Sequence, residues 1–172
     1  AVTIHHLDCG TMTPPLSGRL IGAAAMVDHV LAIVTERDGV ILVDTGFGTR
    51  DCEDPRRLPA AFRALTRPSL DLAQTARAQL HALGFAPADV RHIVITHLDL
   101  DHASGLSDFP DAAVHLHRPE YLAAMAPRGI SETARYVPAQ LEHGPRWVTY
   151  DTGGDTWMDL PAVRQLEGVA AE

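Results

Sequence analysis

Four side chains that could bind a metal ion lie within six residues, directly after an apolar stretch. They are His97, Asp99, Asp101 and His102. Neutral imidazole nitrogens and carboxylate oxygens are the ligands that ions of the zinc type take in proteins. In an extended segment the side chains alternate, so the first three donors are expected on one side, while Leu98 and Leu100 turn toward a core. The run therefore predicts a metal site where a strand gives way to a helix.

Four donors this close in sequence rarely converge on one tetrahedral ion. The more natural arrangement is a two-metal site with ions about 3.5–4 Å apart, in which His97 and Asp99 face one ion and Asp101 and His102 face the other. Each ion then has two protein ligands from this run, whereas a catalytic zinc usually has three and a water. Solvated turn residues, helix caps and incidental surface histidines explain any one of the four, but not all four together.

The run from His97 to His102 reads His-Leu-Asp-Leu-Asp-His and resembles the His-x-His-x-Asp-His signature of the metallo-β-lactamase superfamily. Asp99 stands in place of the second histidine, which makes the site harder and more anionic, so manganese and iron are alternatives to zinc. The earlier run 39–46 resembles the strand of this family that ends in Asp-Thr-Gly. The resemblance implies that Asp44 lies behind the metal ligands and orients them.

The order of segments resembles the branch of the superfamily that includes the N-acyl homoserine lactone lactonases. This resemblance implies an α/β fold, the αβ/βα metallo-β-lactamase-like sandwich, of which about the first half is present. The later motifs of the family, which supply further histidines and a bridging aspartate, have no recognisable counterpart after His102. We therefore expect residues 1–172 to be the N-terminal portion of a single domain, and this portion alone to bind metal weakly.

The resemblance also implies a metal-dependent hydrolase with zinc, and with two ions in the intact enzyme. The ions would activate a water, and Asp101 would both hold one ion and orient or accept the proton of that water. The expected substrate is a small-molecule lactone or ester, and a thioester or phosphodiester is an alternative on the same scaffold. Two further alternatives are a catalytically inactive fragment or binding module, and an iron-dependent oxidoreductase, which the Asp99 carboxylate leaves open.

The composition indicates which classes of binding partner and which cellular compartment are expected for this protein. The chain has 172 residues, of which 46% are hydrophobic, and this is enough for one domain with a real core. The net charge is −8 and the 14 basic residues, all arginine, are scattered, which argues against nucleic acid and acidic membranes as partners. No apolar run approaches the ~20 residues that span a bilayer. The two cysteines are far apart and no signal peptide is visible, so a cytoplasmic protein without disulfides is expected.

Hydrophobic patterns predict the elements that position the donors. Strands are expected at 2–7, 29–36, 40–43, 91–95 and 113–117, and helices at 71–83 and 119–125. The turn Asp38-Gly39 would join the second and third strands. The helix 71–83 is expected to begin with a capping box of Asp71 and Gln74 and to end at Gly84. Residues 9–22 are interpreted as a loop bordering the cleft.

Two further patterns leave alternatives open. Residues 47–68 contain three prolines and are interpreted as irregular or partly helical, with Leu58, Phe62 and Leu65 on one helical face. This surface excursion could form a lid or the contact of a homodimer. His115 and His117 alternate on one face of a strand, and an exposed strand face explains them at least as well as a metal site.

Overall fold

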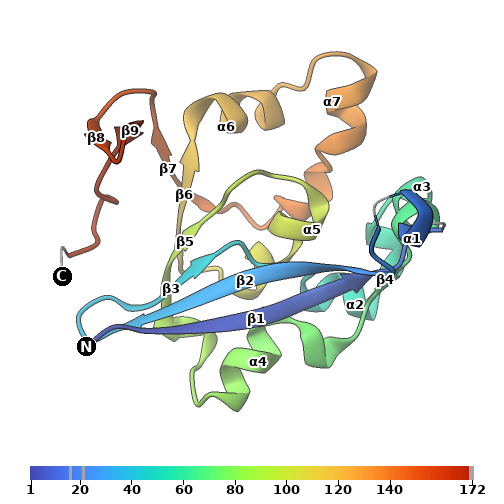
Figure 1. Ribbon diagram of the computed structural model, residues 1–172, viewed down its shortest axis with the longest axis horizontal. Coiled ribbons are helices and arrows are strands. Elements are labelled where there is room, and N and C mark those ends of the chain that lie inside the picture. The colour runs from blue at the N-terminus through green and yellow to red at the C-terminus, as the bar shows by residue number, and fades with distance from the viewer. Residues whose placement is uncertain (16, 21, 171–172) are drawn as a thin grey trace.

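The fold is built around a seven-stranded mixed sheet, as seen in a computed structural model that describes residues 1–15, 17–20 and 22–170. The strands are β1 Thr3–Met12, β2 Met26–Thr35, β3 Gly39–Val43, β4 Pro68–Ser69, β5 Val90–Val94, β6 Ala113–His117 and β7 Arg146–Tyr150. Their order in the sheet is β4-β1-β2-β3-β5-β6-β7 (Figure 1). The strands β4, β1, β2 and β3 pair antiparallel, whereas β3, β5, β6 and β7 run parallel.

Short helices and 3₁₀ turns connect the strands. The helices are α1 Ser17–Leu20, α2 Thr49–Glu53, α3 Ala60–Thr66, α4 Ala76–Ala82, α5 Leu100–Ala103, α6 Arg118–Met125 and α7 Gly129–Arg135. The 3₁₀ turns are η1 Pro55–Arg57, η2 Leu72–Gln74, η3 Pro87–Asp89, η4 Ser104–Asp108 and η5 Pro138–Gln140. A separate two-stranded ribbon is formed by β8 Asp155–Trp157 and β9 Leu160–Val163. None of the helices in the described ranges has the length and apolarity needed to cross a bilayer.

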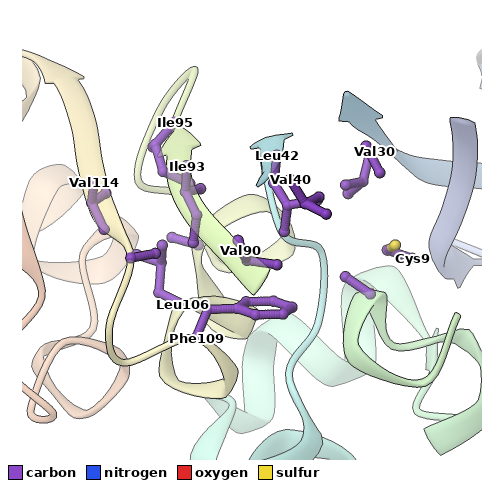
Figure 2. Close-up of a cluster of buried hydrophobic side chains, with 14 of the residues drawn as sticks. Cys9, Val30, Val40, Leu42, Val90, Ile93, Ile95, Leu106, Phe109 and Val114 are labelled. Atoms are coloured by element: carbon purple, nitrogen blue, oxygen red, sulfur yellow. The ribbon is translucent and has the colours of Figure 1, made fainter. Parts of the chain in front are cut away.

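The main core lies on the face of the sheet that α4, η4 and α6 cover. The strands β2, β3 and β5 are rich in valine and isoleucine, as expected where a pleated surface is buried. Leu106 and Phe109 pack against this surface near Val90, Ile93 and Val114 (Figure 2). A smaller cluster forms around α2 and α3 and contains Met12, Phe47, Leu58 and Leu100.

The opposite face of the sheet is only partly covered. Ile4 pairs with Ile33, and Val43 pairs with both Leu31 and Val94, so these side chains share that face. Ile4 is 53% exposed and the other four are half-buried. The sheet thus has one dry face and one face on which apolar side chains meet water.

The expected strands at 40–43, 91–95 and 113–117 and the helix at 119–125 are confirmed to within one residue at each end. The hairpin between β2 and β3 is also confirmed, and Gly39 takes φ 69° there, which glycine adopts without steric cost. Cys9 and Cys52 are both free thiols, as expected.

The first strand is longer than the sequence pattern indicated. Residues 9–12 belong to β1 rather than to a loop, because Thr11 and Met12 pair with β2 on one side and with β4 on the other. These partners lie far away in the sequence, so a local pattern does not reveal them. A register irregularity between Asp8 and Thr11 accompanies this extension.

The expected single helix over 71–83 is wrong in its first turn. Thr75 has extended dihedral angles and caps α4 by accepting a hydrogen bond from the Ala78 N–H at 3.2 Å. Asp71 instead caps η2, and the Gln74 side chain donates to Thr11 Oγ1 at 3.1 Å, so the expected capping box is absent from this part of the structure. A threonine cap satisfies a free helix N–H as well as aspartate does, which moves the start of the helix.

Two other expectations also need correction. Leu58, Phe62 and Leu65 do not share one helical face, because Leu58 precedes α3 and Leu65 is 68% exposed. His115 does not lie on an exposed strand face, since its side chain is fully buried, whereas His117 is exposed. The ring of His115 is hydrogen-bonded at both nitrogens, to His92 Nδ1 at 2.9 Å and to the Tyr150 hydroxyl at 2.7 Å.

Candidate metal centre

The candidate ligands lie where the parallel strands β3 and β5 end side by side. After Val94 the chain leaves the sheet, and Asp99 occupies the N-cap position of the short helix α5 without a capping hydrogen bond from its side chain. Leu98 and Leu100 are 5% and 4% exposed, so they anchor this segment in the core as the alternating pattern predicted. The polar side chains between them face outward at the carboxyl end of the sheet, where α/β proteins commonly place their sites.

The four donors lie in two pairs. His97 Nε2 is 3.4 Å from Asp99 Oδ2, and His102 Nε2 is 3.5 Å from Asp101 Oδ2. The two imidazole rings are 4.1 Å apart between centroids, so the pairs are neighbours. Two ligands of one tetrahedral zinc, each at 2.0–2.2 Å, are separated by roughly 3.3–3.6 Å. Each pair therefore has the spacing of two ligands of one ion.

Asp44 lies behind both histidines. Its Oδ2 is 2.9 Å from His102 Nδ1, and it also accepts hydrogen bonds from the Thr96 N–H at 2.8 Å and the Thr96 hydroxyl at 2.8 Å. The Thr96 oxygen is in turn 2.9 Å from His97 Nδ1. Because Asp44 accepts at both ends of this network, the neutral form of each imidazole carries its proton on Nδ1 and its lone pair on Nε2. This is the form in which histidine binds a metal ion.

The same network shifts the acid–base properties of one ligand. Burial disfavours the charged imidazole of His102, but the hydrogen bond and the charge of Asp44 outweigh burial and raise its pKa. Asp44 itself has φ 61°, a left-handed conformation that is uncommon outside glycine and is found at functional sites. A more basic imidazole is a stronger donor, so this network suits metal binding.

Close backbone contacts fix the loops that carry these residues. The Thr45 N–H and hydroxyl both donate to the His102 carbonyl, at 2.9 and 2.7 Å, and the Gly105 N–H donates to the Gly46 carbonyl at 3.0 Å. A Cβ at Gly105 would lie 2.8 Å from the Thr45 carbonyl oxygen, so only glycine allows this approach. The loop after β3 and the loop after β5 are thereby joined directly behind the donors.

Two groups near the donors were not found from the sequence. Asp28 of β2 is 4% exposed, its Oδ2 has no hydrogen-bond partner among the described residues, and its carboxyl group experiences the charges of Asp101 and His102. Arg135 of α7 forms an ion pair with Asp99 and another with Glu120. A pattern-based signal for Asp28 does exist, because it continues the buried alternation of Val30 and Ala32. The contact of Arg135 has no local signal.

The four candidate ligands form two pairs and no larger group. Over the described part of the chain, no group of three or more histidine, cysteine, aspartate or glutamate side chains is arranged to hold an ion. The two pairs fit zinc by donor type and by spacing, with two protein ligands at each position. Any further ligand must therefore come from water or from groups beyond these four.

Comparison with known proteins places the chain in a family. Residues 27–163 match the metallo-beta-lactamase superfamily. The probable metallo-hydrolase Rv2300c of Mycobacterium tuberculosis is 40% identical over 168 residues, which are 98% of this chain and 51% of that protein. The N-acyl homoserine lactonase AttM of Agrobacterium fabrum is 36% identical over 129 residues, 74% of this chain and 49% of that protein. This chain thus spans about half the length of these relatives.

Solved structures show the same fold. A probable metal-dependent hydrolase from Staphylococcus aureus matches with a TM-score of 0.65 and 18% identity, over 91% of this chain and 61% of that chain. AidC, a dizinc quorum-quenching lactonase solved with a product, matches with a TM-score of 0.61 and 17% identity, over 91% and 60%. The chain belongs to the metallo-beta-lactamase superfamily, and the α/β fold class expected from its sequence is confirmed.

Proposed function

We propose that this chain carries part of the active site of a hydrolase that uses metal-activated water on a lactone or ester. The proposal rests mainly on the two histidine–aspartate pairs, whose separations of 3.4 and 3.5 Å suit two ligands of one ion. The names of the relatives, a metallo-hydrolase and a lactonase, support the same class of reaction. Zinc is the proposed metal, with one ion at each pair, and His97, Asp99, Asp101 and His102 are its proposed ligands.

The residues of this chain have separate roles in the proposed reaction. Divalent ions, when bound, lower the pKa of a coordinated water and polarise a carbonyl oxygen. Asp101, 22% exposed, stands at the rim of the centre and can orient that water and accept its proton. Asp44 and Thr96 accept at the Nδ1 side of the two rings, so the neutral form of each imidazole has its lone pair on Nε2, toward the proposed ion.

An apolar cavity lies on the core side of the segment 97–102, where Leu98 and Leu100 point, and its lining contains none of the four candidate ligands. Its volume is about 280 Å³, and it is lined by residues of this segment, of α6 and of the segment after α7. Among the lining residues are Leu98, Leu100, Met125, Tyr136 and Val137. The cavity therefore does not indicate which substrate the candidate ligands would meet. Three expectations from the sequence stay predictions: that residues 1–172 are a portion of one domain, that the protein forms a homodimer, and that it is cytoplasmic.

Metal content tests this proposal. In equilibrium dialysis against excess free zinc, the chain should bind close to two ions, measured by elemental analysis, and a His97→Ala, His102→Ala double variant should bind none. A chain that binds no zinc would support the alternative of an inert binding module. With N-hexanoyl homoserine lactone as probe, Asp101→Asn should reduce proton release by the zinc-loaded chain about 100-fold without changing circular dichroism. Unchanged turnover would remove Asp101 from the mechanism.

A further inference from the structure

Several contacts hold the Arg135 side chain beside the segment 97–102, which carries the four candidate ligands. Its guanidinium pairs with Asp99 through Nε and with Glu120 Oε1 through Nη2 at 3.0 Å. It also donates to the Tyr136 hydroxyl at 2.9 Å, and its central carbon lies 4.9 Å from the centroid of that ring. Four contacts from three residues hold this side chain, so it is not a freely moving surface arginine.

Glu120 links these contacts of Arg135 to the segment 97–102. Its Oε1 accepts a hydrogen bond from the Leu98 N–H at 2.9 Å, and its Oε2 accepts one from the Tyr136 hydroxyl at 3.0 Å. The Glu120 side chain is 17% exposed, against 38% for Arg135 and 34% for Asp99. The positive charge is thus fixed between two carboxylates, and one of these is a candidate metal ligand.

The other pair of donors has no such positive charge. Among the described residues, no arginine lies within ion-pair distance of Asp101, whose basic neighbour is the His102 ring, and Nδ1 of that ring contacts Asp44. The Asp44 carboxylate adds a second acidic group beside His102, at 2.9 Å from its Nδ1. The charged neighbours of the two pairs therefore differ in sign: a guanidinium lies beside Asp99, and the Asp44 carboxylate lies beside His102.

We propose that Arg135 is a built-in counter-ion that makes the two metal positions unequal. It neutralises Asp99 and repels a divalent cation, so the position of His97 and Asp99 binds the ion more weakly than the position of Asp101 and His102. The aspartate at position 99 makes this pairing possible, because a neutral histidine there would not attract the guanidinium. Arg135 is a positioning residue that sets the order in which the two ions bind. This inference rests on the proposed function, since it assumes that both pairs bind metal.

Cobalt titration measures the two positions separately. Co²⁺ would be added to the metal-free chain, and its visible absorption bands recorded in competition with a chelator of known affinity. We expect two binding steps. Arg135→Gln should tighten the weaker step at least tenfold and leave the stronger step within about threefold. Arg135→Lys keeps the positive charge and should retain most of the difference between the steps.

Two more variants make the test decisive. Arg128→Gln removes a positive charge at the residue that precedes α7, outside the group of Asp99, Glu120 and Arg135. This variant should change neither binding step. Glu120→Gln removes the carboxylate that balances Arg135 and should weaken the weaker step further. Circular dichroism of each variant verifies folding, and the stronger step serves as an internal reference.

The outcomes separate the inference from the proposed function. If Arg135→Gln leaves both steps unchanged while cobalt still binds in two steps, the counter-ion role is wrong and the metal site stands. If Arg135→Lys behaves like Arg135→Gln, geometry rather than charge is responsible, and the inference is also wrong. If the unaltered chain gives no cobalt absorption at all, the proposed metal site itself fails.

Discussion

Replacing Asp28 by asparagine should remove a pH dependence from the stability of this protein. Asp28 lies on the covered face of β2, and within the described part of the chain its Oδ2 atom has no hydrogen-bond partner. A Cβ at Gly10 would lie 2.4 Å from that oxygen, so the bare backbone of Gly10 makes room for the carboxyl group. Asparagine has nearly the same shape, and the substitution therefore changes charge far more than packing.

The sign and size of the effect follow from the pKa of Asp28. Burial, followed by the charge of Asp101, raises this pKa from 3.8 to about 8. Between pH 4 and 8 the native state then holds one proton more than the unfolded chain. The free energy of unfolding must fall as the pH rises through this window, by about 1.4 kcal/mol per pH unit and by at most about 5–6 kcal/mol in total. Asparagine does not titrate, so the variant lacks this contribution.

Urea denaturation followed by tryptophan fluorescence measures this difference. Both proteins would be studied from pH 4.5 to 9 in the presence of a chelator, so that metal binding does not contribute. The variant should gain several kcal/mol relative to the unaltered protein between the two ends of the range. Asp111→Asn, at an exposed position, is the matched control and should follow the unaltered protein. Parallel profiles for Asp28→Asn and the unaltered protein would show that Asp28 is ionised in the native state.

Burial, followed by the charge of His92, lowers the pKa of His115 from 6.5 to about 4. The unfolded chain then binds a proton that the native state excludes, so the free energy of unfolding should fall by up to about 3 kcal/mol as the pH drops from 6.5 to 4. In urea denaturation, His115→Phe should flatten this dependence on pH. An unchanged dependence would assign the effect to other groups. Gly105→Ala places a Cβ 2.8 Å from the Thr45 carbonyl oxygen and should cost about 1–3 kcal/mol in thermal unfolding. Gly18→Ala, with no neighbouring atom within 4 Å of the added carbon, is its control, and equal stabilities would show that the two loops can separate without cost.

Much of the candidate site could be predicted because its information is local. The donors are consecutive or nearly so, and alternation places Leu98 and Leu100 in the core, as their low exposure confirms. The place of Asp44 came only from resemblance to a family, since nothing in an Asp-Thr-Gly turn says which histidine it contacts. In the structure Asp44 contacts His102, 58 residues later.

The parts that could not be predicted depend on long-range contacts. Arg135 reaches Asp99 across 36 residues, and on the sequence it is one of 14 scattered arginines. His115 is buried because β7 and the segment near residue 167 bring the Tyr150 hydroxyl over it, while the strand pattern alone is equally compatible with exposure. The helix start at Thr75 was missed for a different reason: Asp71 and Thr75, four residues apart, are both possible caps, and the tertiary contact of Gln74 with Thr11 favours the later one.

The direct union of the two loops behind the donors has a thermodynamic consequence. Thr45, in the loop after β3, and Gly105, in the segment after β5, each donate hydrogen bonds to the other loop. The backbone around His102 is therefore ordered in the metal-free protein. Capture of an ion then restricts few additional torsions, so its entropy should be dominated by release of water from the cation rather than by freezing of the chain. Calorimetry should accordingly record a small heat-capacity change and a favourable entropy, and amide protons of this loop should exchange slowly with solvent before any ion is added.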